Sequence, residues 1–141
     1  MADKMSKFQF ARPMLTKLEY GPGTGDPSHR PIQIDLHFLR AMQQLSENSA
    51  VVELTLQINK TEDTVHKDAV YWMEVRYGAV FNWEEGCCED EVNRFLRINA
   101  PALLLAYIRT TVAQVTAESP YGVYHVPFLD MTQVFKEDTV Q

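Results

Sequence analysis

Apolar and polar residues alternate with a period of two in the first half of the chain. A strand places successive side chains on opposite faces of a sheet, so such alternation is typical of antiparallel strands with one buried face. The apolar side of one run is Ile32, Ile34, Leu36 and Phe38, and that of a second run is Val52, Leu54, Leu56 and Ile58.

Two further segments complete a predicted set of four strands. Residues 8–20 form an extended stretch, and Pro13 inside it predicts an edge or bulged strand, because proline has no N–H for the ladder. Residues 68–81 alternate again and predict the fourth strand. The predicted connections are polar or rich in glycine and proline: residues 21–31, 43–49 and 60–67.

The second half of the chain has helical sequence. Residues 89–98 begin with acidic side chains, which the positive end of the helix dipole favours. Pro101 suits the first turn of a second helix that runs to about Glu118, with Asn99 as its N-cap. Residues 129–135 predict a short closing helix.

Strands followed by helices, instead of alternating with them, indicate an α+β fold. We therefore expect a four-stranded antiparallel sheet followed by a long helix and a short C-terminal helix. A length of 141 residues suits one domain. Residues 1–141 are accordingly expected to form a single domain, with strands in about 8–81, helices in about 89–135 and a polar tail at 136–141.

The long helix has apolar residues on two sides. One row consists of Leu104, Ile108, Val112 and Val115. The second row is made mostly of Leu103, Ala106, Ala113 and Ala117. A helix in so small a domain that buries two sides suggests an oligomer, so the first row is our candidate for a subunit interface.

Composition disfavours several classes of partner. The net charge is −6, and the 13 lysines and arginines are scattered along the chain, whereas nucleic acids and anionic membranes are bound through clustered basic residues. No apolar run approaches the roughly 18 residues of a membrane span, so direct membrane insertion is not expected. The first residues lack the pattern of a signal peptide. Cys87 and Cys88 are neighbours, a spacing that strains a disulfide, and we expect reduced thiols in a cytoplasmic protein.

Side chains for catalysis or metal binding are not grouped in the sequence. The four histidines fall in separate segments, and none has a second ligand at metal spacing. No phosphate-binding loop of a recognised pattern is present. The acidic residues around the two cysteines do not favour a reactive thiolate. We therefore predict no catalytic residue, no metal site and no cofactor, and we do not expect an enzyme.

Several short features stand in a characteristic order. The second half contains a proline that starts a helix, a Tyr-x-Arg triplet, a break and an extended segment: Pro101, Tyr107–Arg109, Pro120 and His125–Phe135. The first half adds Phe8–Phe10 with Arg12, and Tyr71–Val75 followed by Gly78–Phe81. This order and spacing over residues 8–135 resembles the SecB family of protein-export chaperones. The resemblance implies a four-stranded sheet packed with helices and assembled as a dimer of dimers, a homotetramer.

The resemblance also implies a function. Members of the family hold unfolded or precursor polypeptides without ATP and deliver them to the export motor SecA. SecA docks there on the exposed sheet face through acidic and apolar residues, so the candidates for that contact are Trp72, Glu74 and Arg76. Candidates for a hydrophobic client groove are Phe81, Trp83, Tyr124, Phe128, Met131 and Phe135.

Two other classes of function stay open. SecB-like proteins also accompany toxin–antitoxin pairs, so the same fold can be dedicated to one partner such as an antitoxin. A small hot-dog-like thioesterase also wraps a sheet around a long helix, but here an acid–base group on the helix is missing. A general holdase suppresses aggregation of many unfolded polypeptides, whereas a dedicated partner protein does not.

Overall fold

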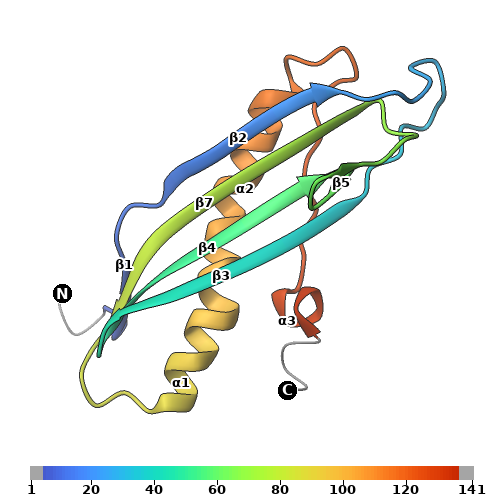
Figure 1. Ribbon diagram of the computed structural model, residues 1–141. Helices are drawn as coiled ribbons and strands as arrows, with labels where there is room; N and C mark the ends of the chain where they lie inside the picture. The colour runs from blue at the N-terminus through green and yellow to red at the C-terminus, as the bar shows by residue number, and fades with distance from the viewer. Residues whose placement is uncertain (1–4, 137–141) are drawn as a thin grey trace.

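The computed structural model describes residues 5–136 and consists of an antiparallel sheet with a long helical rod across one face (Figure 1). Across the sheet, β1 and β2 both lie beside β7, and β4 and β3 follow in that order. A two-stranded hairpin, β5 and β6, extends the connection between β4 and β7. The strands are β1 (Phe8–Phe10), β2 (Met14–Pro22), β3 (Leu36–Ser46), β4 (Ser49–Ile58), β5 (Lys60–Thr61), β6 (Thr64–Val65) and β7 (Tyr71–Trp83).

The predicted first strand is present as two pieces on one edge. β1 and β2 both pair with β7, and Pro13 lies buried between them. The Ala11 N–H still donates to the Val80 carbonyl at 2.8 Å, so the gap in the ladder is short. The register shifts between Leu15 and Lys17. The edge is therefore interrupted and bulged, as expected for a strand that contains proline.

The boundaries of β3 and β7 differ from the expectation. β3 begins at Leu36 instead of Ile32, and it continues to Ser46. Residues 47–48 are enough to make the turn into β4, so most of the polar connection predicted there belongs to the ladder. β7 extends two residues beyond the predicted end, to Trp83.

The helical half forms one continuous rod of α1 (Glu89–Arg94), the π-helical turn η2 (Phe95–Asn99) and α2 (Ala100–Thr116). The prediction of an N-cap at Asn99 is wrong, because its dihedral angles (φ −71°, ψ −40°) are helical. Pro101 has no N–H for the Arg97 carbonyl, which accepts a hydrogen bond from Arg40 Nη1 of β3 at 2.6 Å. The π-turn and this arginine together accommodate proline inside the rod.

One side of α2 packs on β7 and β4 and forms the core with them. Leu104, Ile108 and Val112 have exposed fractions of 0%, and Val115 is half-buried against the same cluster. The expectation that this row is a free subunit interface is corrected, because the sheet of the same chain already covers it. An apolar helical row indicates burial but does not identify the covering element.

After α2 the chain runs back beside the rod in extended form and reaches α3 (Met131–Val134) near β3 (Figure 1). Asp130 caps α3, since its Oδ1 accepts a hydrogen bond from the Thr132 N–H at 2.9 Å. The hydrogen bonds from Thr132 also lower the pKa of Asp130. The α+β class, with an antiparallel sheet, a long helix and a short C-terminal helix, is therefore confirmed. Within residues 5–136, every helix is too short or too polar to cross a bilayer.

Candidate functional site

A groove with a volume of about 690 Å³ lies between the edge strand β3 and the C-terminal helix α3. Leu36 and Phe38 of β3 form one wall, and Val134 of α3 belongs to the other. All three side chains are half-buried, so part of their apolar surface faces solvent. The lining residues are Leu36, His37, Phe38, Leu129, Gln133, Val134, Phe135 and Lys136.

The backbone of β3 is available beside this groove. The Asn59 N–H donates to the Asp35 carbonyl, and the Asp35 N–H donates to Asn59 Oδ1, both at 2.9 Å. Residues directly opposite in an antiparallel ladder alternate between bonded and non-bonded pairs. The register that continues from this pair directs the backbone groups of Leu36, Phe38 and Arg40 away from β4. Leu36 and Phe38 thus present apolar side chains, and backbone groups that point away from β4, on the same open edge of the described sheet.

Arg40 joins the two walls at one end of the groove. Its guanidinium lies 4.2 Å from the centroid of the Phe135 ring, a cation–π distance. The same side chain donates to the Arg97 carbonyl in η2. Arg40 therefore links β3, the helical rod and the end of α3.

The structure disperses the six predicted groove residues. Phe81, Trp83 and Met131 are buried in the core, so the expectation that they line an open groove is corrected. The first two stand on the helix-facing side of β7 and are covered by the rod. Phe135 is likewise largely buried, with 9% of its surface exposed, but it borders the groove.

The remaining two candidates lie on the extended segment before α3. Tyr124 is half-buried against the core. Phe128 is 94% exposed, and its ring centroid lies 5.1 Å from the Arg109 guanidinium. Sequence reasoning missed Leu36, Phe38, Leu129 and Val134, because their pattern predicts only a buried face. The sequence does not indicate that the C-terminal helix packs beside an edge strand, and this packing is what forms the groove.

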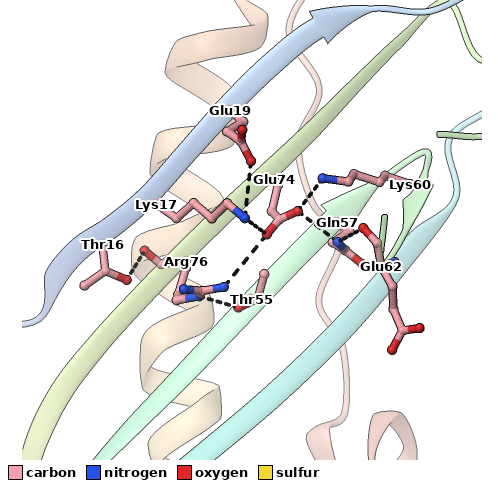
Figure 2. A network of polar contacts seen from close by, with 9 residues as sticks. All are labelled: Thr16, Lys17, Glu19, Thr55, Gln57, Lys60, Glu62, Glu74 and Arg76. Carbon is pink, nitrogen blue, oxygen red and sulfur yellow. Dashed lines mark hydrogen bonds and ion pairs between the residues drawn. The ribbon is translucent and has the colours of Figure 1, made fainter. Parts of the chain in front are cut away.

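The three predicted contacts on the outer face of the sheet, Trp72, Glu74 and Arg76, lie close together, but Glu74 is buried. Glu74 is only 3% exposed although helices cover the opposite face. Its Oε1 accepts hydrogen bonds from Lys60 Nζ at 2.8 Å and from Gln57 Nε2 at 2.9 Å. Its Oε2 lies 2.9 Å from Lys17 Nζ and 3.9 Å from Arg76 Nη2. Figure 2 shows these side chains converging on the Glu74 carboxylate from three neighbouring strands and the β5 hairpin.

This arrangement fixes the charge of Glu74. Burial by itself raises the pKa of Glu74, but the hydrogen bonds from Lys60, Lys17 and Gln57 outweigh it and lower the pKa to about 2. The carboxylate is ionised and fully engaged inside the sheet surface. The expectation that Glu74 is an exposed acidic contact is therefore corrected.

Trp72 and Arg76 are half-buried and reach the outer surface. The Trp72 ring packs over Gly21, and Lys60 Nζ lies 4.9 Å from the ring centroid. Arg76 Nε donates to Thr55 Oγ1 at 3.0 Å. Around Glu74, the outer face is therefore a surface of mutually paired polar side chains beside the Trp72 ring.

Ligand sets for a metal are not evident in the described part of the chain. Within residues 5–136, no group of three histidine, cysteine or acidic side chains is arranged to hold a metal ion. Cys88 is exposed and Cys87 is half-buried, and both are free thiols.

Comparison with known proteins agrees with the fold. The family profile of SecB, described as preprotein translocase subunit SecB, matches residues 24–141. The protein-export protein SecB of Anaplasma phagocytophilum (strain HZ) is 30% identical over 94 residues, which cover 65% of this chain and 59% of that protein. The protein-export protein SecB of Jannaschia sp. (strain CCS1) is 24% identical over 121 residues, which cover 85% and 68%. The chain thus spans less than two thirds of the length of the first of these relatives.

A solved structure has the same architecture. A SecB-like chaperone of Mycobacterium tuberculosis, in complex with a peptide from an antitoxin, superposes with a TM-score of 0.68 at 17% identity, covering 86% of this chain and 90% of that one. At this identity the likeness concerns the fold. Since the SecB profile also matches most of the sequence, the chain belongs to the SecB family.

Proposed function

We propose that the protein is an ATP-independent chaperone that holds unfolded or precursor polypeptides in the groove between β3 and α3. The supporting observation is an open apolar groove beside the backbone of Leu36 and Phe38, which points away from β4 at the edge of the described sheet. An extended client segment offers alternate side chains to such a groove and its backbone groups to such an edge. Membership of the SecB family supports the same role.

One groove binds only weakly. A client segment that buries about 300 Å² of apolar surface gains about 7 kcal/mol. Ordering each client residue costs about 1–2 kcal/mol for the backbone alone, so a few residues offset most of that gain. Tight holding then depends on several grooves that engage one long chain. We therefore propose a homo-oligomer, with the tetramer that the family resemblance implies.

The surface that we propose for self-association is the β2 strip, defined as Phe10, Leu15, Leu18 and Tyr20 with Tyr107 of α2. Each of these side chains is between 37% and 44% exposed. They share the helix side of the sheet, since Phe10, Leu15, Leu18 and Tyr20 pair with inward-facing residues of β7. A contiguous apolar strip of this kind on a monomer marks an interaction surface. It replaces the buried row of α2 as the candidate interface.

A dedicated role is the alternative. The M. tuberculosis SecB-like chaperone of similar fold is bound to a peptide from an antitoxin. We propose as a second candidate that the groove serves one such partner. A dedicated protein would bind its partner peptide and ignore unrelated unfolded polypeptides, whereas a general holdase would bind them all.

Delivery of clients to SecA is a separate part of the proposal. Trp72 and Arg76 stay the predicted contacts on the outer face, and Glu74 is withdrawn because its carboxylate is buried. Binding of purified SecA, with and without a loaded client, tests this part independently of client binding.

Reduced and alkylated ribonuclease A is a suitable test client because it is permanently unfolded and basic, whereas this chain carries a net charge of −6. Native ribonuclease A is the folded control with the same sequence. A Val134→Glu substitution places a charge in the groove, and Val123→Glu is the matched control on an exposed site outside it. We expect Val134→Glu alone to weaken binding. Equal binding of native and unfolded ribonuclease A, or equal loss in both variants, would reject the groove as the client site.

A further inference from the structure

The segment that connects α2 to α3 is held by side chains. Within residues 5–136, no backbone–backbone hydrogen bond joins residues 120–129 to another element. Thr116 Oγ1 instead accepts a hydrogen bond from the Tyr124 N–H at 2.8 Å. Further along, Arg109 donates to two consecutive carbonyls of the segment. An extended chain without a ladder depends on such side-chain bonds for its position.

Arg109 donates two hydrogen bonds to adjacent backbone carbonyls of the segment. Its Nε donates to the Val126 carbonyl at 2.8 Å, and its Nη2 donates to the Pro127 carbonyl at 2.9 Å. The guanidinium also lies 5.1 Å from the Phe128 ring centroid. A planar fork that bonds two adjacent carbonyls fixes both the position and the direction of the backbone, which a single ammonium group does not.

This anchor lies next to the groove wall. Leu129, which lines the groove, is two residues after Pro127, and α3 begins two residues later at Met131. Beyond the anchor, α3 is held by the buried side chains of Met131 and Phe135 and by the contact of Arg40 with the Phe135 ring. We propose that Arg109 is a positioning residue for the client groove. It fixes the backbone at Val126 and Pro127, so that Leu129 and α3 form a wall opposite β3 before a client binds.

The proposal rests on the proposed function of the groove, and it predicts a distinct effect. When Arg109 is replaced, a client must order the wall on binding, and affinity falls because preorganisation is lost. The Arg109→Gln variant should bind reduced and alkylated ribonuclease A about tenfold more weakly, the loss expected when two charge-assisted hydrogen bonds no longer preorganise a site. Arg109→Lys keeps the charge without the fork and should recover part of the affinity. The matched control is Arg12→Gln, an exposed arginine in the connection between β1 and β2.

Hydrogen exchange separates positioning from general destabilisation. In Arg109→Gln the amides of residues 120–135 should exchange faster, whereas those of β4 and β7 should keep their protection. Unchanged affinity together with unchanged exchange of residues 120–135 would overturn the proposal. Should Arg109→Gln fail to fold, Arg109→Lys decides by the same two measurements. If the unaltered protein does not bind unfolded ribonuclease A, the proposed function fails, and the exchange measurement alone then upholds or overturns the anchoring by Arg109.

Discussion

The buried carboxylate of Glu74 makes the stability of the fold depend on pH, and a Glu74→Gln variant isolates that dependence. The folded-state pKa of Glu74 is about 2, below its ordinary value of 4.5. A depressed pKa means that the folded state prefers the ionised carboxylate, so the stabilisation is present above pH 4.5. It is lost as the pH falls through the window between 4.5 and 2, because the unfolded chain takes up the proton first.

The magnitude follows from the difference between the two pKa values. A difference of about 2.5 pH units corresponds to about 3 kcal/mol in the free energy of unfolding. By pH 3 the unfolded chain is almost fully protonated at Glu74 and the folded chain is not, so about 2 kcal/mol of this is already lost. Lys17 and Arg76 are about one third exposed, so solvent screens part of the interaction and these values are upper bounds. A loss of this size is a large part of the stability of a small domain.

The assay is urea denaturation at a series of pH values between 7 and 3. The unaltered protein should lose about 2 kcal/mol more than Glu74→Gln over this range, because the amide does not titrate. At pH 7 the variant should be less stable, since Lys17 and Lys60 lose their buried counter-ion. Glu85→Gln, at an exposed loop position, is the matched control and should follow the unaltered protein. If the free energy of unfolding fell equally between pH 7 and pH 3 in the unaltered protein and in Glu74→Gln, Glu74 would not be the source of the pH dependence.

Two other substitutions test the outer face and the β2 strip. A Cβ at Gly21 would lie 2.6 Å from Trp72 Nε1, so Gly21→Ala should displace the indole, change its fluorescence and lower stability by about 1–2 kcal/mol. Gly78→Ala is the control, because its methyl meets the movable Glu53 Cγ at 3.1 Å, and an equal loss there would argue against the ring contact. Leu18→Glu should lower the molar mass measured by light scattering. An unchanged mass would remove the β2 strip as the interface.

The sequence was most informative about the apolar face of a strand, although Thr55 and Gln57 on the other face of β4 are buried as well. The alternation in residues 52–58 predicted the inner face of β4, because a central strand under a helix has no other place for its apolar residues. Pro13 likewise predicted the broken edge. Asn99 was misread because its neighbour Pro101 suggested a helix start. The structure resolves that position with a π-turn and a hydrogen bond from Arg40, a residue far away in sequence.

The candidate site was harder to predict for a physical reason. Phe81 and Phe135 have equivalent apolar character in the sequence, but Phe81 packs between β1 and the helical rod, whereas Phe135 borders the groove at β3. The burial of Glu74 could not be predicted without knowing that Lys17, Lys60 and Gln57, which come from other segments, contact its carboxylate. A polar residue in an alternating strand pattern is predicted to face solvent. Here the long side chains of Lys17 and Lys60 cover Glu74, and this cover depends on the tertiary structure. Which strand lies at the edge of the sheet, and which polar side chains meet, depends on the order of the strands. The periodicity of the sequence does not specify that order.

The weak energetics of one groove connect the proposed interface to the proposed activity. A Leu18→Glu variant keeps every residue that lines the groove, since the β2 strip lies at the opposite edge of the sheet from β3. If it is monomeric, its affinity for a short peptide should be unchanged, because that peptide fills a single groove. Its affinity for full-length unfolded ribonuclease A should fall by at least about 100-fold, because the second and later contacts are no longer intramolecular. A monomer that holds the long chain as tightly as the unaltered protein would show that one groove is sufficient, and the multi-groove mechanism would be wrong.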